Sequence, residues 1–375
     1  MSPRFLYVHV PFCARRCSYC DFAVHVARTP PVDAWLAAIE AELAGVVRRE
    51  GWTEKPVLRT VYVGGGTPSL LGPGAMNALR EQLSRYVELD GVEEWTAEAN
   101  PESLTAELAR DWRAAGVNRI SLGVQTFHEP ALRWMGRLHG PDGAERAVRA
   151  AREAGITNVS VDLIFGLPAR LGRDWGSDLA RALELEPEHI SLYGLTAEAG
   201  APLGRWVRAG REVLPDEEAY AEEFLLAAER LPAAGFVHYE VSNFSKPGRE
   251  SVHNRAYWTG EAYVGLGPGA HSYLPPRRYW NVRDWNAYVA MLGRGELPVA
   301  GEERVTGSAA ALERIWLGLR TAEGIEGMAW SAGQERLLRR WRSEGWVRED
   351  ADAVRLTPRG WLLLDRLAVE LEGAA

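Results

Sequence analysis

The stretch YVHVPFCARRCSYCDF, residues 7–22, holds the only three cysteines of the 375-residue chain, Cys13, Cys17 and Cys20. A strand-like apolar run leads into the first of them, so the thiols are expected in one loop at the end of a strand. Three thiols within eight residues make poor disulfide material, because one of them would be left over. The chain is therefore expected to work in a reducing cytoplasm, and the thiols are candidate metal ligands.

An iron–sulfur cluster accounts for three thiolates without a fourth. In a 4Fe–4S cluster, thiolates from one loop can bind three irons and leave the last iron for a ligand that is not protein. S-adenosylmethionine (SAM) suits that iron because its amino and carboxylate groups chelate a metal. An electron from the cluster can then split the sulfonium C–S bond and release a 5′-deoxyadenosyl radical. Two alternatives stay open at this point: a zinc site completed by His9 or His25, and inert buried cysteines.

Strand-like and helical segments alternate from the start of the chain to about residue 200. This alternation predicts parallel strands joined by right-handed helical crossovers, in a sheet that is either doubly wound or curled into a barrel. In a barrel, polar residues at the carboxyl ends of the strands carry the chemistry. The predicted strands cover 4–10, 57–65, 95–100, 118–124, 158–166 and 188–195, and the predicted helices cover 33–49, 74–87, 105–115, 141–154 and 174–185.

The second half of the chain is less regular. It contains a predicted helix at 216–234, a predicted strand at 236–244, the Gly-rich segment VGLGPGAHS at 264–272 and a predicted linker at 293–301. The rest, 308–375, has the pattern helix, turn, helix, small hairpin (GWVRED…AVRLTPRG) and last helix, which is winged-helix-like. The predicted domains are a core at 1–235, an extension of the core at 236–300 and a C-terminal domain at 301–375.

The composition is that of a globular protein without a nucleic-acid footprint. Hydrophobic residues make up 46% of the chain and charged residues 25%, which are ordinary fractions. The formal net charge is −8, and no basic stretch is interleaved with aromatic residues, so we expect no nucleic-acid partner. No apolar run approaches the ~20 residues of a membrane span, and the N-terminus lacks the features of a secretory signal. We therefore expect no integral membrane segment.

Polar residues gather at the predicted strand ends. GGGTPS at 64–69 follows a strand, and its glycines allow the main chain to approach a ligand closely. Glu98, Gln125 and Asp162 each lie at a strand end, where a barrel places ligand-binding groups. Arg137, in LRWMGRLHG, has a forked guanidinium that suits a carboxylate. Taken singly, each of these features also has a structural explanation: a tight turn, a helix cap or ion pair, and a surface arginine.

Six segments in a fixed order carry a family resemblance. They are YVHVPFC with its cysteines, GGGTPS, EANPE, SLGVQTF, MGRLHG and VDLIFGLP, over residues 7–168. The cysteine motif, with an aromatic residue before its last cysteine, resembles the radical SAM superfamily. The whole set is similar to the branch that contains HemN, the oxygen-independent coproporphyrinogen dehydrogenase, and its relative HemW. This resemblance covers nearly the whole chain, more loosely at the C-terminus.

The resemblance implies a fold and a set of cofactor-binding residues. The fold is α/β, a radical SAM partial (β/α)6 barrel with a small C-terminal winged-helix-like α+β domain. The implied ligands of the 4Fe–4S cluster are Cys13, Cys17 and Cys20. The implied SAM-contacting residues are Tyr7, Tyr19, Gly65, Gly66, Thr67, Glu98, Gln125, Arg137 and Asp162.

Two departures separate this chain from the dehydrogenase type. That type continues its motif to C-x-x-x-C-x-x-C-x-C, whereas this chain has Phe22 at the fourth cysteine position. It also has a long N-terminal extension before its first cysteine, whereas Cys13 lies close to the start of this chain. Both features resemble HemW.

A third feature, HNRAYW at 253–258, resembles the H-N-x-x-Y-W haem-binding motif of HemW. On a helix, His253 and Tyr257 share one face, as do Asn254 and Trp258. The resemblance implies that these four residues contact haem and that His253 is a candidate ligand of the haem iron, because an imidazole can bind iron and aromatic rings can pack on a porphyrin. The hexapeptide by itself also fits a structural histidine beside two core aromatic residues.

HemW proteins are regarded as haem chaperones, so the resemblance implies a protein that binds haem and transfers it to acceptor haem proteins. Respiratory haem proteins are the acceptors expected by family analogy, and an electron donor is a further implied partner. The competing prediction is an enzyme, either a coproporphyrinogen III dehydrogenase or a HemN-like radical SAM methyltransferase. The chain has no C-x-x-C-H motif, which excludes c-type haem attachment.

Overall fold

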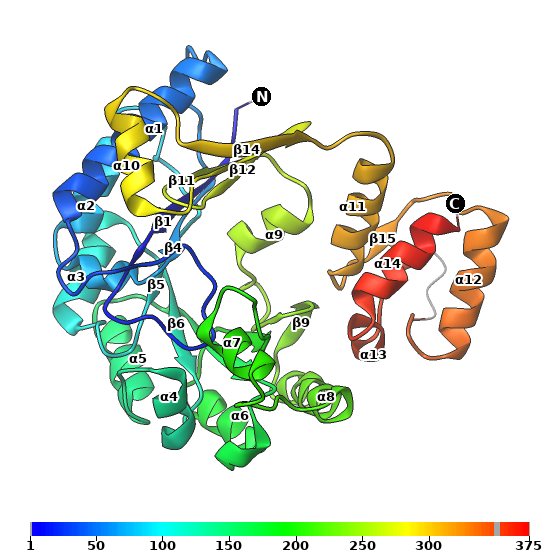
Figure 1. Cartoon of the computed structure of the whole chain (residues 1–375). Helices are drawn as coiled ribbons and strands as arrows, with labels where there is room; N and C mark the ends of the chain where they lie inside the picture. The colour runs from blue at the N-terminus through cyan, green and yellow to red at the C-terminus, as the bar shows by residue number, and fades with distance from the viewer. Residues whose placement is uncertain (1, 349–352, 375) are drawn as a thin grey trace.

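A twelve-stranded sheet forms the body of the protein (Figure 1). The computed structural model describes residues 2–348 and 353–374. The strand order is β14-β13-β12-β11-β1-β4-β5-β6-β7-β8-β10-β9. The centre consists of six parallel strands: β1 (Phe5–Val10), β4 (Thr60–Gly65), β5 (Glu94–Ala99), β6 (Arg119–Gln125), β7 (Asn158–Phe165) and β8 (His189–Gly194). The predicted α/β class and the partial (β/α)6 barrel are therefore confirmed.

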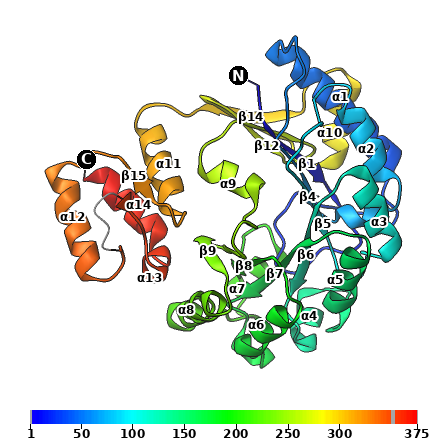
Figure 2. The same cartoon turned by 180° about the vertical axis from the view of Figure 1, so that it is seen from behind.

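Helices cover the convex face of the six central strands (Figures 1 and 2). They alternate with the strands along the chain, as crossovers between parallel strands require. These helices are α1 (Val32–Glu50), α2 (Ala75–Leu83), α3 (Ala106–Ala115), α4 (Glu129–Met135), α5 (Gly143–Glu153), α6 (Trp175–Glu184) and α8 (Glu217–Ala233). Helix α7 (Pro202–Arg208) lies instead beside the cysteine loop, where the Leu203 N–H donates to the Ser18 carbonyl oxygen at 2.8 Å. Two 3-10 turns, Pro68–Leu71 and Ala169–Leu171, lie in the loops after β4 and β7.

The central strands have one apolar face, which packs under the helices, and one polar face toward the concave side, as the alternating sequence RISLGVQ of β6 shows. Val8, Val61 and Ile120, on three of these strands, are fully buried. The helix ends follow ordinary capping chemistry. At α3, for example, the Thr105 hydroxyl accepts a hydrogen bond from a first-turn N–H, and Gly116 ends the helix in the left-handed conformation.

Four strands extend the sheet beyond β1. They are β11 (Tyr263–Leu266), which pairs in parallel with β1, and the antiparallel strands β12 (His271–Leu274), β13 (Arg277–Asn281) and β14 (Val299–Arg304). The segment 293–301, predicted to be a linker, therefore ends inside a strand, because Val299 pairs with Asn281 of β13. Helix α10 (Trp285–Gly293) connects β13 to β14 and lies beside α1.

The opposite edge of the sheet is a small hairpin. The predicted strand 236–244 is in fact two strands, β9 (Val237–Glu240) and β10 (Asn243–Ser245), and β10 pairs antiparallel with β8. The turn between them forms because the buried Glu240 carboxylate accepts hydrogen bonds from the Ser242 N–H and the Asn243 amide. A buried carboxylate with local donors thus breaks a run of strand-forming residues that is continuous in the sequence.

Helix α9 (Val252–Trp258) lies on the concave side of the sheet, between the strands and the C-terminal domain (Figures 1 and 2). Its start is fixed by Glu94 of β5, whose carboxylate accepts hydrogen bonds from the N–H groups of Val252 at 2.9 Å and His253 at 3.1 Å. The Ser251 hydroxyl caps the same end. A negative charge at a helix N-terminus is stabilising, so α9 is firmly attached to the barrel interior.

The C-terminal domain faces the concave side of the sheet through α11 and α14 (Figure 1). Its elements are α11 (Gly307–Leu319), β15 (Ile325–Glu326), α12 (Ala332–Ser343), β16 (Ala353–Val354), α13 (Pro358–Trp361) and α14 (Leu364–Gly373), and β15 pairs antiparallel with β16. The tip of the predicted hairpin, at 349–352, lies outside the described residues. In the described part of the chain, no helix has both the length and the apolar character needed to span a bilayer.

Candidate functional site

A cavity of about 1380 Å³ lies between the carboxyl ends of the central strands, α9, β12 and the helices α11 and α14. Its volume exceeds the roughly 300–1,000 Å³ of a pocket for one small ligand, so it has room for more than one group. Every predicted cluster and SAM-contacting residue lines it, together with two of the four predicted haem-contacting residues. These are Tyr7, Cys13, Cys17, Tyr19, Cys20, Gly65, Gly66, Thr67, Glu98, Gln125, Arg137, Asp162, Tyr257 and Trp258.

The cysteine loop is held by two short strands, β2 (Phe12–Cys13) and β3 (His25–Val26), which pair in parallel. All three cysteines are free and half-buried. Burial raises the pKa of the Cys13 thiol to about 11 and also raises the pKa of Cys20. Iron that binds here therefore has to displace protons from these sulfur atoms.

Two side chains from other segments donate to these sulfur atoms. The Thr67 hydroxyl lies 3.5 Å from Sγ of Cys13, and Nη1 of Arg137 lies 3.9 Å from Sγ of Cys17. A hydroxyl donor and a guanidinium cation both stabilise negative charge on sulfur. These two donors therefore offset part of the effect of burial, and they favour the thiolates that are the ligands of iron–sulfur clusters.

The arrangement of the thiols differs from a site for a single metal ion. Among the described residues, no three Cys, His, Asp or Glu side chains converge as the ligands of one ion. The two histidines near the loop have other contacts. His9 donates from Nε2 to the Ala23 carbonyl oxygen at 2.8 Å and accepts from the Tyr7 hydroxyl at Nδ1, and His25 packs against Phe12. A 4Fe–4S cluster has several irons, so its thiolates do not have to converge on one point.

The glycine loop after β4 packs against β1 as well as lining the cavity. Gly65 has a φ of 111°, and a Cβ at this position would lie 2.3 Å from Cε1 of His9. A Cβ at Gly66 would lie 2.7 Å from the Phe12 carbonyl oxygen. Both distances are too short for non-bonded atoms, so larger residues do not fit this turn. The glycines are therefore required for packing against His9 and Phe12, whether or not a ligand approaches them.

The carboxylates of Glu98, near the end of β5, and Asp162, which lies in the middle of β7 and not at the predicted strand end, are half-buried and already hydrogen-bonded. Glu98 accepts hydrogen bonds from the Gly65 N–H and the Tyr62 hydroxyl, both at 2.8 Å. Asp162 accepts from the Ser121 hydroxyl, which lies 3.0 Å from each carboxylate oxygen. Burial raises the pKa of both carboxyl groups. Their orientation is thus fixed before any ligand binds, and each can still accept hydrogen bonds from ligand hydroxyl groups.

Arg137 places a buried positive charge in the cavity wall. Its Nη2 donates to Oδ1 of Asn100 at 2.7 Å and to the Gly123 carbonyl oxygen. Its Nε has no hydrogen-bond partner among the described residues. A guanidinium that is permanently charged and still has an unused donor is suited to bind a ligand carboxylate.

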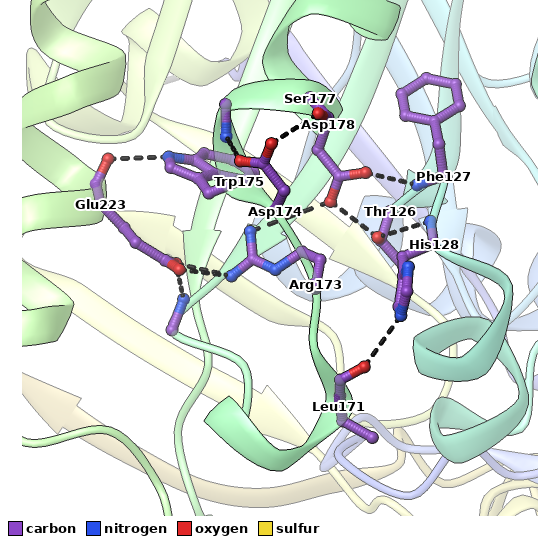
Figure 3. Close-up of polar contacts among 12 residues, drawn as sticks. Thr126, Phe127, His128, Leu171, Arg173, Asp174, Trp175, Ser177, Asp178 and Glu223 are labelled. Atoms are coloured by element: carbon purple, nitrogen blue, oxygen red, sulfur yellow. Dashed lines mark hydrogen bonds and ion pairs between the residues drawn. The ribbon is translucent and has the colours of Figure 1, made fainter.

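Gln125 ends β6 with a backbone φ of 70°, which is unusual for a residue other than glycine. Its Oε1 is buried without a partner among the described residues. The next residues are held by Asp178, which accepts hydrogen bonds from the Thr126 hydroxyl at 2.7 Å and from the Phe127 N–H at 2.8 Å (Figure 3). The surrounding contacts thus hold the unusual backbone that places Gln125 at the cavity wall.

The same polar network reaches the loop after β7. Arg173 is buried, pairs with Glu223 of α8 at 2.6 Å and lies 3.8 Å from Asp178 (Figure 3). Glu223 also accepts a hydrogen bond at 2.7 Å from the N–H of Gly166, which directly follows β7. Because β6 and β7 each carry a predicted SAM-contacting residue, this network sets the position of one relative to the other.

The HNRAYW motif is divided between the core and the cavity. Tyr257 and Trp258 line the cavity, whereas His253 and Asn254 do not. His253 is only 1% exposed, its Nδ1 lies 2.6 Å from the Thr60 hydroxyl, and its Nε2 lies 2.8 Å from the Tyr257 hydroxyl. Burial lowers the pKa of this imidazole to about 3, so the ring is neutral. In this arrangement His253 holds α9 against β4, and its role as an iron ligand stays a prediction.

Several cavity residues have no role in the sequence-based prediction. Asn100 lies in the EANPE segment and donates to the Thr67 hydroxyl at 3.3 Å, and Tyr193 lies at the end of β8. His271 and Tyr273 of β12 line the opposite wall. The sequence feature that could have pointed to His271 is the Gly-rich segment VGLGPGAHS, in which a histidine directly follows a strand and a turn.

Comparisons with known proteins cover nearly the whole chain. The sequence profile of the Radical SAM superfamily matches residues 7–177. The chain is 38% identical over 375 residues to the heme chaperone HemW of Mycobacterium tuberculosis, which covers 99% of this chain and 95% of that protein. It is 34% identical over 366 residues to the heme chaperone HemW of Bacillus subtilis, which covers 95% of this chain and 96% of that protein. The fold is similar to that of coproporphyrinogen III oxidase (HemN) from Escherichia coli, with a TM-score of 0.84, 22% identity and coverage of 99% of this chain and 90% of that chain.

Proposed function

Because the chain belongs to the HemW family of the radical SAM superfamily, we propose that it is a haem chaperone, which binds haem and transfers it to acceptor haem proteins. We further propose that it carries a 4Fe–4S cluster with SAM bound to one of its irons. The observation that carries the proposal is the cavity of about 1380 Å³, which is lined by the three cysteines on one side and by aromatic residues of α9, β12 and α11 on the other.

The cluster and SAM would be held by residues that the cavity brings together. The three cysteines would bind iron, and a cluster with SAM supplies one-electron chemistry when both are present. The unused Nε of Arg137 is a donor for the SAM carboxylate, and the unused Oε1 of Gln125 is an acceptor for an ammonium or hydroxyl group. The other proposed SAM contacts are Tyr7, Tyr19, Gly65, Gly66, Thr67, Glu98 and Asp162.

Haem would bind on the aromatic side of the cavity, against Tyr257 and Trp258. The guanidinium carbon of Arg320 lies 4.3 Å from the Trp258 ring centroid and 4.8 Å from that of Trp316. This stack joins α9 to α11 and fixes the aromatic wall. Porphyrins are flat, and large aromatic side chains pack well on flat apolar surfaces. His253 and Asn254 belong to the same motif but do not line the cavity. His253 supports Tyr257 through a hydrogen bond and remains the motif's candidate iron ligand.

The proposed partners are haem, acceptor haem proteins and an electron donor. Respiratory haem proteins are the proposed acceptors by analogy with the family. Three free cysteines within eight residues support a reducing compartment, and we place the protein in the cytoplasm.

The test uses anaerobically purified protein with a reconstituted cluster. One sample is titrated with hemin, and a parallel sample is incubated with coproporphyrinogen III, SAM and a reductant. The proposal expects a stoichiometric haem spectrum in the first sample and no vinyl product in the second. Catalytic formation of vinyl product would instead support the dehydrogenase alternative. A final sample, loaded with haem, is mixed with an apo respiratory haem protein, and failure of haem to move to that acceptor contradicts the transfer step.

A further inference from the structure

Haem iron commonly takes an imidazole ligand, and the chain has eight histidines. Two of them, His9 and His271, line the cavity. Both ring nitrogens of His9 are used in hydrogen bonds with Tyr7 and Ala23. The ring of His271 makes no hydrogen bond or ion pair with the described residues, and its side chain is exposed. His271 is therefore the cavity histidine whose nitrogens are available to an iron.

The surface around His271 suits a flat ligand with an acidic edge. His271 pairs across the strands with Trp280, and their rings stack with centroids 5.8 Å apart and planes at 24°. Tyr273, on the same face of β12, pairs with Arg278, whose guanidinium carbon lies 5.0 Å from the Tyr273 ring centroid. The wall thus combines aromatic rings with an arginine that already pairs with Glu303 and Glu313, so the cation left for a ligand carboxylate is Arg283.

The turn that leads to His271 is rigidly held. Gly267 has a φ of 100°, and a Cβ there would lie 2.7 Å from the His9 carbonyl oxygen. The Gly267 N–H donates to the buried Glu42 carboxylate at 2.7 Å, and the Asn281 amide donates to the Gly267 carbonyl oxygen at 2.9 Å. The start of β12 is therefore positioned before any ligand arrives, which is what an effective ligand residue needs.

The electrostatic surroundings keep the His271 ring in the form that binds metal. Partial burial lowers the pKa of His271, and the positive charges of Arg278 and Arg283 lower it further. A neutral imidazole has a free nitrogen lone pair, whereas the protonated ring has none. Arg283 also lines the cavity, and its charge is opposite to that of the haem carboxylates.

We propose that His271 is an imidazole ligand of the haem iron in this cavity. The inference rests on the proposed haem-binding function and adds a ligand outside the HNRAYW motif. His253 is enclosed in the core in the same structure, so the two histidines make separate and testable contributions.

Hemin titration of three single variants tests the proposal, with absorption and electron paramagnetic resonance spectra as readouts. The variants are His271→Ala, His271→Phe, which keeps a ring against Trp280 without a metal ligand, and the matched control His128→Ala, a half-buried histidine outside the cavity lining. Both changes at His271 should weaken haem binding at least about tenfold and remove the signature of imidazole ligation, because loss of a ligand costs at least as much as loss of its supporting partner. Free imidazole should restore the spectrum of His271→Ala, and His128→Ala should match the wild type.

The outcomes separate this inference from the function on which it rests. If wild type binds haem and the His271 variants keep its spectrum and affinity, the inference is overturned and haem binding stands. If wild type binds no haem stoichiometrically, the proposed function fails and the inference fails with it. Unchanged iron content and circular dichroism in His271→Phe establish that its loss of haem is not a loss of fold.

Discussion

Nε2 of His253 and the hydroxyl of Tyr257 lie 2.8 Å apart, and this hydrogen bond connects a core histidine to an aromatic ring of the cavity wall. The other ring nitrogen, Nδ1, is hydrogen-bonded to the Thr60 hydroxyl of β4. One imidazole therefore couples the packing of α9 to the shape of the cavity. Substitution of His253 acts on the fold and on ligand binding at once, and the two effects need separate measurements.

The first prediction concerns the stability that this histidine provides. His253→Ala should lower the free energy of unfolding by about 2–4 kcal/mol, because it leaves a cavity and a buried Thr60 hydroxyl without its partner. Tyr257→Phe, which removes only the hydroxyl, should cost about 1 kcal/mol. Denaturant unfolding followed by circular dichroism measures both. Equal stability of His253→Ala and wild type would contradict the structural role of the histidine.

The second prediction concerns the buried guanidinium. Arg137→Lys should weaken SAM binding at least about tenfold, since a lysine cannot reproduce the forked contacts and loses a charged hydrogen bond. The matched control is Arg133→Lys on α4, because Arg133 is exposed and, among the described residues, forms an ion pair only with Glu129 of the same helix. Equilibrium dialysis with SAM, on protein with a reconstituted cluster, gives both affinities. The role assigned to Arg137 is rejected if the two variants bind SAM equally well.

A third prediction separates backbone strain from steric overlap in the glycine loop. Gly65→Ala should destabilise the protein by more than Gly91→Ala, although both glycines have positive φ. A Cβ at Gly91 meets no atom within 4 Å, so that variant should cost only the roughly 1–2 kcal/mol of the left-handed conformation. At Gly65 the overlap with His9 adds to that cost. Urea unfolding of the two variants, side by side, provides the comparison.

The fourth prediction concerns the metal. Serine in place of Cys13, Cys17 or Cys20 should remove the visible absorption of the cluster and most of the bound iron and sulfide, because each thiolate holds a different iron. The circular dichroism spectrum should change little, since none of the three cysteines belongs to the hydrophobic core clusters. Iron and sulfide analysis of anaerobically purified protein is the measurement. Zinc without iron in the wild-type protein would refute both the cluster and the SAM site.

The fifth prediction concerns pH. Burial raises the pKa of Glu42 from the ordinary 4.5 to about 7, although Tyr288, Gly267 and Asn281 donate hydrogen bonds to it. Between these two values the unfolded chain loses the proton and the folded protein keeps it. The contribution of Glu42 to stability is therefore fully present below about pH 4.5 and is lost as the pH rises to 7, a loss on the order of 3 kcal/mol.

Glu42→Gln, which resembles the protonated side chain, should flatten this decline, as unfolding titrations from pH 4.5 to 7 will show. Glu240 has a pKa raised to about 7 by burial as well, so part of the decline should persist in the variant. Glu40→Gln is the matched control, because Glu40 lies on the same helix and pairs at the surface with Arg85. An identical slope for Glu42→Gln and wild type would mean that Glu42 titrates normally.

The central strands and the residues at their ends could be predicted because each depends on local pattern. Apolar runs followed by Gly, Glu or Gln mark the carboxyl ends of parallel strands, and the structure brings these ends together around one cavity that Asp162 also lines from the middle of β7. The cysteine spacing is equally local. These features are properties of short segments, so they can be predicted without knowledge of the tertiary contacts.

Other features depend on contacts between distant segments and could not be predicted. Whether His253 faces a ligand or the core is decided by Thr60, which is 193 residues away in the chain. The sequence before and within Val299–Arg304 contains Pro and Gly and therefore predicts a linker. The segment is a strand because it pairs with β13, which the sequence pattern does not reveal. The role of His271 in the cavity wall depends on β11, which aligns in parallel beside the first strand of the chain.

The sheet described above has two edges, β9 and β14, within the described residues, and these edges do not pair with each other. A flat ligand such as haem would therefore pass between these two edges without breaking the backbone hydrogen bonds between neighbouring strands of the sheet. The contacts on that route include the side-chain contact from Nη1 of Arg278 to Glu313 of α11 at 3.0 Å. They also include backbone hydrogen bonds from the Val241 N–H to the Arg320 carbonyl oxygen and from the Ala322 N–H to the Tyr239 carbonyl oxygen, both at 2.9 Å. Passage between the two edges would then require the C-terminal domain to separate from β9, with loss of backbone as well as ionic contacts.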